Sequence, residues 1–227
     1  MMLVATSLTV ALVASSSFAV AAAAASDILS LPPMIVNVAT AANVPSSLVA
    51  RMLEEADAIW RGAGFTFVWR HAAREVVPYA RTSEAGPYVP ARLRVVVGNE
   101  PGVSFDGKLP LGWILFDDVT TPEQEIHVSY GNARQFMTGA RGIVGIVEEM
   151  PTTQREWLLG RAMGRALAHE LGHYLLASKA HTAKGLMRAS RTASEFFALE
   201  RGAFAIDPAQ RRAIVARLTG ETLVVRR

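Results

Sequence analysis

The chain of 227 residues contains no cysteine, so no disulfide bond can contribute to its stability. If the protein is exported, its hydrophobic core and any bound metal must hold the fold together. Without the N-terminal segment described below, about 200 residues remain, enough for a single domain with a full core. We expect this domain to span residues 31–227.

Dense positive charge is lacking as well. The net charge of +3 and the isoelectric point of 9.6 come from arginines scattered along the chain. No aromatic platform accompanies these arginines, as it would in many nucleic-acid-binding proteins. We therefore expect no nucleic-acid partner and interpret the arginines as a solvated surface.

The first 25 residues contain no charged side chain. Residues 3–13 are strongly apolar, and the alanine-rich residues 19–25 offer several pairs of small residues at the spacing typical of signal-peptide cleavage. This pattern predicts a signal peptide over residues 1–25 and a secreted or periplasmic mature protein without stable membrane association. The alternative is a retained membrane anchor, because the uncharged segment is long enough to span a bilayer.

The rest of the chain alternates between patterns typical of strands and of helices, which predicts the α+β class. Five segments are predicted strands because they are rich in β-branched and aromatic residues between turn residues: 34–39, 65–70, 92–97, 111–116 and 125–130. A helix over 48–61, between the first two strands, predicts a parallel pair with a right-handed crossover. The last strand alternates polar with apolar residues, as an edge strand would.

Residues 72–90 and 98–110 are predicted loops, and 131–150 contains four glycines and is left unassigned. Residues 194–201 and 207–218 are predicted helices, the second beginning at Asp207-Pro208, where aspartate caps and proline suits the first turn.

Histidine is scarce, with five in the chain, yet His169, His173 and His181 fall within thirteen residues. The first two belong to the motif His-Glu-x-x-His. On a helix, residues four apart lie on one face with Cβ atoms about 5–6 Å apart, so their imidazoles can converge on one zinc ion. Glu170 follows the first histidine, and its carboxylate can take a proton from a water that the metal activates.

The sequence around the motif predicts the helix that it needs. Thr153 and Glu156 fit a capping box at the start, and the predicted end lies at residues 177–179. Apolar residues recur every two to four positions between them: Trp157, Leu159, Met163, Leu167, Leu171 and Leu175. Three glycines interrupt the helix at a cost of about 1 kcal/mol each relative to alanine: Gly160, Gly164 and Gly172. We interpret them as places where another backbone or the metal site comes close.

A catalytic zinc usually has three protein ligands and one open position. His181 follows the predicted end of the helix, where the chain can turn back beneath the metal, and is the preferred third ligand. Glu195 and Glu200, in the next predicted helix, are the alternatives.

The pattern formed by this motif, by His181 and by Gly185-Leu186-Met187 resembles the zincin metallopeptidases, and among them the metzincins. The resemblance implies three zinc ligands, His169, His173 and His181, with Glu170 as the general base. It also implies that Met187 lies in a turn beneath the metal; the alternative is that Leu186-Met187 belongs to the ordinary core.

Two features depart from the metzincin pattern. The third histidine follows the second by eight positions here, against about six in the family. Leu176 also stands where the family has glycine. We therefore expect a longer loop before the third ligand.

The resemblance also implies a fold. A twisted mixed sheet of about five strands would pack on a backing helix and on the helix that carries the motif, within an N-terminal subdomain of residues 31–178. Residues 179–227 would form a small helical C-terminal subdomain. In zincins the edge strand above the active-site helix binds extended peptide, which places 111–130 near the cleft.

The predicted function is that of an exported zinc metalloendopeptidase acting on peptides or proteins. A gluzincin-like peptidase is the alternative if Glu195 or Glu200 binds the metal. A non-catalytic, metal-binding exported protein is the other, although a structural site has no need of Glu170. Arg188 and Tyr130 are candidate oxyanion donors by location or side-chain type alone, and the sequence leaves the oligomeric state open.

Overall fold

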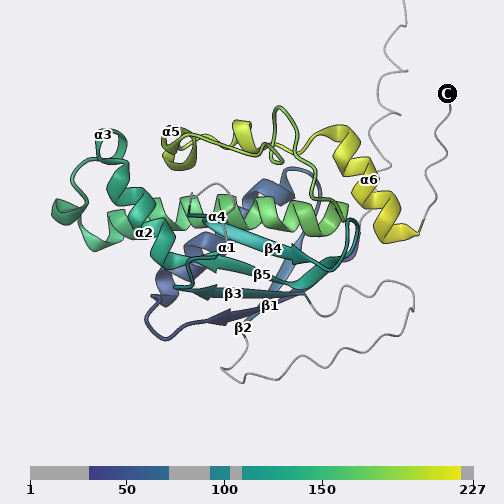
Figure 1. Ribbon diagram of the computed structural model, residues 1–227, viewed down its shortest axis with the longest axis horizontal. Coiled ribbons are helices and arrows are strands. Elements are labelled where there is room, and N and C mark those ends of the chain that lie inside the picture. The colour runs from purple at the N-terminus through teal and green to yellow at the C-terminus, as the bar shows by residue number, and fades with distance from the viewer. Residues whose placement is uncertain (1–30, 72–92, 103–108, 221–227) are drawn as a thin grey trace, which may run out of the picture. The chain divides into compact units, whose positions relative to one another are not determined.

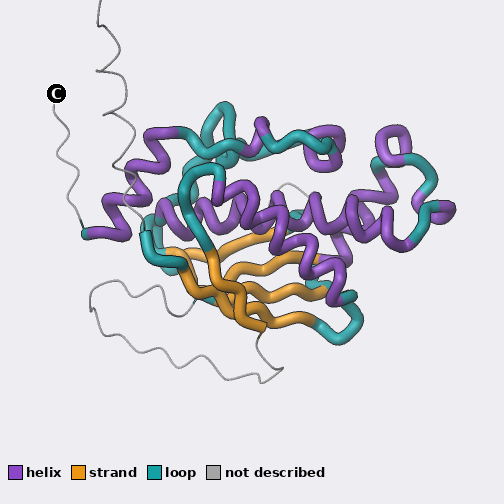
Figure 2. Tube along the Cα trace, turned by 180° about the vertical axis from the view of Figure 1, so that it is seen from behind, coloured by secondary structure: helices purple, strands orange, loops and turns teal. Residues whose placement is uncertain are grey.

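A computed structural model describes residues 31–71, 93–102 and 109–220, in which a five-stranded mixed sheet carries two long helices on one face (Figures 1 and 2). These residues belong to one compact unit that begins at Leu31. The predicted signal peptide and the predicted loop at 72–90 lie outside the described residues. No described helix is long and apolar enough to cross a membrane.

The sheet has the strand order β2-β1-β3-β5-β4. Four strands run parallel: β1 (Met34–Thr40), β2 (Phe67–His71), β3 (Arg94–Gly98) and β5 (Pro122–Ser129). The fifth, β4 (Gly112–Phe116), pairs antiparallel with β5 and forms one edge of the sheet. The predicted α+β class with a mixed sheet of five strands is confirmed.

The prediction that the half-polar strand at 125–130 lies at the edge is wrong, because β5 lies between β3 and β4. Ile126 and Val128 are buried on the face that carries the helices. Glu125 and His127 point to the other face and stay partly exposed. A strand inside a sheet with one covered face alternates just as an edge strand does, so the pattern alone could not separate the two.

Two helices cover the buried face. Helix α1 (Ser46–Arg61) connects β1 to its parallel neighbour β2, and α4 (Thr152–Leu176) packs along α1, β4 and β5 (Figure 1). The indole Nε1 of Trp60 donates a hydrogen bond of 3.2 Å to the carbonyl of Ala168. The bond fixes α1 to α4 next to the first histidine of the motif.

The glycines of α4 lie where other parts of the chain come close. A Cβ added at Gly164 would lie 2.6 Å from the carbonyl oxygen of Met52 and 2.6 Å from the Cβ of Glu55, both on α1. A Cβ at Gly160 would lie 2.7 Å from that of Arg51. The interpretation of these glycines as points of close backbone approach is confirmed.

Replacing Gly164 with alanine should therefore destabilise the protein. The added methyl group meets backbone on α1 and forces the two helices apart, at an overpacking cost of about 1–3 kcal/mol, although alanine favours the helix by about 1 kcal/mol. Denaturant unfolding of the variant measures the change. Gly142→Ala is the control, since a Cβ there meets nothing within 4 Å; equal stability of both variants would contradict the packing argument.

The C-terminal end of α4 agrees with the prediction, whereas the predicted cap at its N-terminal end does not form. The helix begins at Thr152 after Pro151, and no side chain caps it, so the predicted capping box at Thr153 is wrong. Thr153 lies inside the first turn, where its hydroxyl cannot act as the cap. The helix ends at Leu176 because Ala177 adopts a left-handed conformation with φ 48° and ψ 47°, within the predicted range of 177–179.

The remaining elements are short helices. Residues left unassigned in the sequence form α2, α3 and η1: Tyr130–Gly139, Arg141–Val144 and Val147–Glu149. The C-terminal part contains α5, η2 and α6: Ala193–Phe197, Gly202–Phe204 and Pro208–Thr219. The helix predicted at 194–201 is shorter, because Ala198 has extended backbone. Asp207 caps α6 as predicted, its side chain accepting from the N–H of Ala209 at 2.8 Å.

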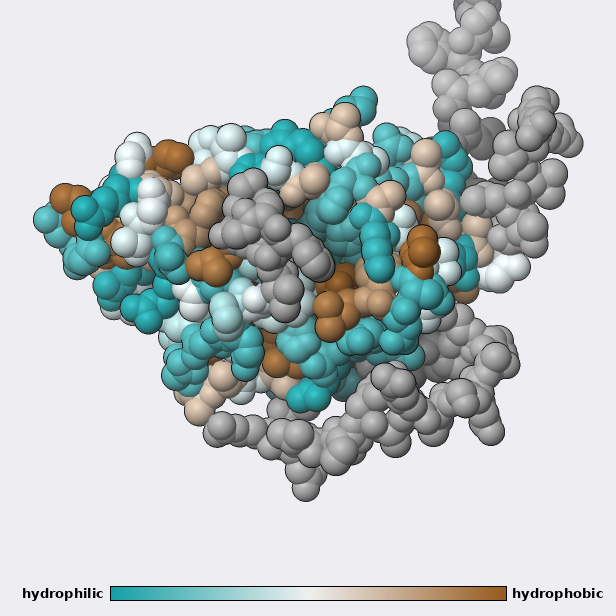
Figure 3. Space-filling view, in the orientation of Figure 1, coloured by the Kyte–Doolittle hydropathy of each residue, from teal (hydrophilic) through white to brown (hydrophobic). Residues whose placement is uncertain are grey.

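Apolar side chains are exposed where α3 lies, at the left end of the molecule in Figure 3. Ile143 and Ile146 are each about half exposed there. This end lies away from the histidine motif, which is near the other end of α4.

Candidate metal centre

His169 and His173 lie one turn apart near the C-terminal end of α4, with ring centroids 4.7 Å apart and the planes nearly perpendicular. Their Nε2 atoms face each other at 3.0 Å. Zinc–nitrogen bonds of about 2.0–2.1 Å in tetrahedral geometry would place two nitrogen ligands about 3.3 Å apart. The pair is thus already spaced as two ligands of one zinc ion.

The outer nitrogen of each ring fixes its orientation. His169 Nδ1 lies 2.8 Å from the carbonyl oxygen of Leu186, and His173 Nδ1 lies 2.7 Å from that of Ser178. A carbonyl oxygen only accepts hydrogen bonds, so each Nδ1 carries the proton and donates it. Each Nε2 is then left with a free lone pair, which is how metal-binding histidines are usually oriented.

His181 completes a cluster of three. Its ring stacks on that of His169 at 5.3 Å and meets His173 edge-on at 4.9 Å. One ring nitrogen from each of the three histidines lies within 4.8 Å of the others. The loop that separates His181 from α4 is longer than in the metzincin pattern, yet it returns the third imidazole to the first two.

The carboxylates considered as alternative ligands are engaged elsewhere. Glu195 pairs with Arg188 and lies 3.6 Å from Arg191 Nη1, and it accepts from the N–H of Thr192 at 2.9 Å. Glu200 has an exposed side chain, and its backbone carbonyl accepts from Arg165. Neither belongs to the cluster of possible ligands in the described chain, so the geometry favours His181.

A tight turn over residues 185–188 supports the cluster from below. Gly185 has a φ of +74°, and its carbonyl accepts from the N–H of Arg188 at 3.3 Å. Met187 is buried, and its Sδ would lie 2.2 Å from a Cβ added at Gly172. The glycine thus makes room for the methionine beside His173. The turn also provides the Leu186 carbonyl that orients His169.

The histidines are held neutral. Burial, followed by the neighbouring His173, lowers the pKa of His169 to about 3. Burial also lowers the pKa of His173 and of His181. Because a metal binds the unprotonated ring, these shifts keep the three imidazoles ready to bind it at neutral pH.

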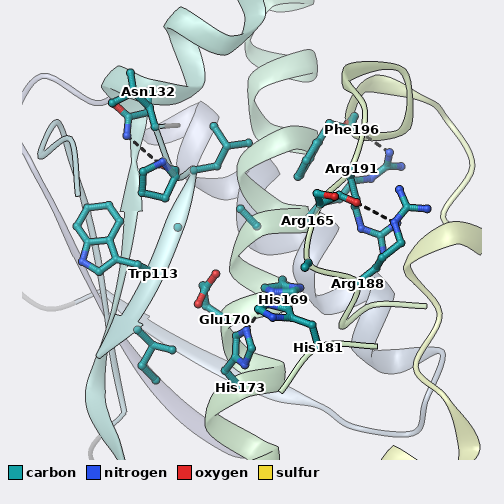
Figure 4. A pocket seen from close by; sticks show the side chains of 18 of the residues that line it. Trp113, Asn132, Arg165, His169, Glu170, His173, His181, Arg188, Arg191 and Phe196 are labelled. Atoms are coloured by element: carbon teal, nitrogen blue, oxygen red, sulfur yellow. Dashed lines mark hydrogen bonds between the residues drawn. The ribbon is translucent and has the colours of Figure 1, made fainter. Parts of the chain in front are cut away.

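Glu170 points away from the histidine pair toward β4 and into the cleft (Figure 4). Burial raises the pKa of its carboxyl to about 8, although a hydrogen bond from the backbone of Ile114 acts in the opposite direction. Gly112 leaves room for it, since a Cβ there would lie 3.1 Å from Glu170 Cγ. A nearby cation would favour the ionised carboxylate, which can then accept a proton.

A cleft of about 1060 Å³ runs over these residues. In Figure 4 the strand β4 forms one wall, α4 the floor, and the segment from Arg188 to Phe196 the opposite wall. Arg188 lines this cleft, but Tyr130 lies in another pocket, beside α1 and α2. Because it lies outside the cleft, Tyr130 is not placed to stabilise an oxyanion at the histidines. On β5, His127 stacks on Trp113 of β4 with ring centroids 4.9 Å apart.

The wall opposite β4 is fixed by two arginines of α4, Arg161 and Arg165, which the sequence did not reveal. Arg165 has a fully buried side chain and donates to Glu55 at 2.9 Å. It also donates to three backbone carbonyls of the opposite wall: Glu195, Phe196 and Glu200. Arg161 donates to the carbonyl of Phe197 at 2.6 Å. The prediction that the arginines form a solvated surface is wrong at Arg165, since an arginine beside apolar residues gives no signal of burial.

The chain is similar in structure to archaemetzincin from Methanopyrus kandleri, with a TM-score of 0.46 and 14% sequence identity over 82% of this chain and 96% of that one. No family model matches the sequence, and no curated protein is significantly similar to it.

Proposed function

We propose that the protein is a zinc-dependent metallopeptidase of the metzincin type, exported from the cytoplasm, that hydrolyses internal bonds of peptides or proteins. The observation that carries this proposal is the convergence of three neutral imidazoles beside a buried carboxylate in a cleft. A structural zinc site has four protein ligands, whereas this cluster has three within the described chain.

The donor set suits zinc. Three histidines are the protein ligands of one familiar kind of catalytic zinc site. The two Nε2 atoms of α4 are close to the spacing that zinc requires, and both Nδ1 atoms are bonded to carbonyls that raise the basicity of the ring. His169, His173 and His181 would hold the ion. Bound zinc would polarise the attacking water and the carbonyl of the scissile bond.

Glu170 moves the proton. Its carboxylate is ionised when a cation lies beside it, accepts a proton from the attacking water, and delivers that proton to the leaving amine nitrogen. The hydrogen bond from the Ile114 backbone holds the carboxylate in place, and the lack of a side chain at Gly112 leaves room for it. The surrounding burial excludes bulk water, so the proton passes between the reacting atoms.

Strand β4 can bind an extended substrate. Ser129 N–H donates to the Leu111 carbonyl at 2.9 Å, so the main-chain groups of Leu111 point toward β5. Groups alternate along an antiparallel edge, and those of Gly112 and Ile114 point to the cleft side. A peptide added there as a further strand would run past the histidines.

The proposal is tested with purified protein loaded with zinc and a mixture of denatured proteins, with new peptide termini identified by mass spectrometry. We expect cleavage that a chelator abolishes and that zinc restores. Zinc binding without any metal-dependent cleavage would instead favour a non-catalytic metal-binding protein. Detection of the mature chain outside the cytoplasm, beginning near residue 25, tests export.

A further inference from the structure

The wall opposite β4 carries more positive than negative charge. We name Arg188, Arg191 and Glu195 the arginine wall. One carboxylate, that of Glu195, serves both arginines: it pairs with Arg188 and lies 3.6 Å from Arg191 Nη1. Both arginines line the cleft beside His181 (Figure 4).

Arg191 is locked in position. Its guanidinium donates to the carbonyls of Gly185 and, at 3.0 Å, of Ala203, and it lies 4.0 Å from the ring centroid of Phe204. Its side chain is 4% exposed, and its buried Nη1 makes no hydrogen bond with any residue that the structure describes. Arg191 is thus a fixed charge whose donors the protein does not fully use.

The neighbouring charges do not neutralise this excess. Arg165 and Arg201 both pair with Glu55, at 2.9 and 2.6 Å. Four arginines therefore share two glutamates across this region. Apart from the histidines and arginines, the charged residues that line the cleft are Glu123, Glu170 and Lys179. Within the described part of the chain, no further carboxylate faces the arginine wall from its own side of the cleft.

Arg188 has a different role from the buried arginines. Arg165 and Arg191 bond to backbone carbonyls of distant segments, and they hold the wall together. Among the described residues, Arg188 donates to the carbonyl of Ser190, two residues away, and to Glu195, and its side chain is 33% exposed. Its guanidinium can therefore turn to a ligand in the cleft without loss of a tertiary contact.

We infer that the arginine wall is a subsite for a carboxylate of the substrate, in which Arg188 exchanges Glu195 for that carboxylate and Arg191 supports it by its charge. The inference rests on the proposed function, since it names the peptides which that same cleft would prefer. The carboxylate comes either from an aspartate or glutamate side chain or from the C-terminus of the peptide. Guanidinium groups suit both, because they bind carboxylates through two parallel hydrogen bonds.

The test is binding of synthetic decapeptides to the zinc-loaded Glu170→Gln protein, which should not cleave them. Each position is in turn glutamate or glutamine, and each peptide has a free or an amidated C-terminus. We expect one position, or the free terminus, to favour the carboxylate by roughly fivefold in Kd, as expected for a partly exposed ion pair, and to lose this preference at high salt. A preference for glutamate over glutamine at one position identifies a side-chain carboxylate, and a preference for the free over the amidated C-terminus identifies the terminal carboxylate.

Three further substitutions in that background separate a substrate contact from a structural role. Arg188→Gln should bring the ratio of Kd values, without and with the carboxylate, close to one. Arg141→Gln removes an exposed charge outside the cleft and should leave this ratio unchanged. Glu195→Gln should increase the preference, because it removes the competing charge while glutamine can still cap α5. If Arg188 only supported the structure of the wall, Arg188→Gln would weaken the binding of all peptides equally.

The outcomes also separate this inference from the proposed function. Two results would overturn the carboxylate subsite even if the wild type cleaves peptides. One is equal binding of every peptide with and without the carboxylate, and the other is a preference for the carboxylate that survives Arg188→Gln. Selective binding by a protein that cleaves nothing would keep the subsite and overturn the peptidase.

Discussion

A Glu170→Gln variant should bind zinc as the wild type does and lose about 10²–10⁴-fold in kcat, the contribution typical of a general base. Glutamine keeps the size of the side chain and can still accept the hydrogen bond from the Ile114 backbone, but it cannot take up a proton. The histidines, which are oriented by Leu186 and Ser178, are untouched. Steady-state cleavage of a peptide and zinc analysis of the same sample measure the two effects.

Glu156→Gln is the matched control, because Glu156 lies on α4 about four turns before Glu170 and outside the cleft. We expect it to have wild-type activity. A Glu170→Gln protein that turns over at more than about a tenth of the wild-type rate would exclude Glu170 as the general base. Loss of zinc in the variant would instead indicate that the carboxylate supports the metal.

Arg165→Met should lower the free energy of unfolding by about 3–5 kcal/mol, the usual cost of removing one partner of a buried ion pair. The arginine side chain is fully buried, and its loss leaves three carbonyls of the cleft wall and one side of Glu55 without their donor. Denaturant unfolding measures the effect. We also expect the C-terminal wall to become more sensitive to proteolysis, because Arg165 is its main polar link to α4.

Arg155→Met provides the control on the same helix. The side chain of Arg155 is partly exposed, and among the described residues it donates to the hydroxyl of Thr152 alone, at 3.1 Å. Its replacement should therefore change the free energy of unfolding by less than about 0.5 kcal/mol. In a double-mutant cycle, Glu55→Gln should cost less in the Arg165→Met background than in the wild type. A loss below about 1 kcal/mol for Arg165→Met would contradict the expectation that the substitution leaves Glu55 as a buried charge without a sufficient partner.

The sequence predicted the site better than its surroundings. The spacing of His169 and His173 on a helix is a local property, and the structure places both imidazoles on one face as expected. The position of His181 depends on a loop, yet scarcity of histidine and one nearby helix end were enough to single it out. Glycines in an otherwise regular helix likewise predicted close contacts at Gly164 and Gly172.

What the sequence did not predict depends on contacts between distant segments. Arg165 is separated from Glu55 by 110 positions, and nothing near it indicates that its charge is buried. The place of β5 inside the sheet follows from the pairing of β4 with it, which alternation within one strand does not reveal. The short helices between Tyr130 and Glu149 are rich in glycine, so their propensity was too weak to predict them.

The most direct test of the metal centre is the zinc content of the purified mature protein, compared with that of His181→Ala. We expect about one zinc per wild-type chain and the loss of most of it in the variant after dialysis against a weak chelator, because a site with three protein ligands would keep only two. His71→Ala, which removes an exposed histidine at the end of β2, should keep its zinc. Full retention in His181→Ala would contradict the three-histidine site, and a wild type that binds no zinc after reconstitution would contradict the metal centre altogether.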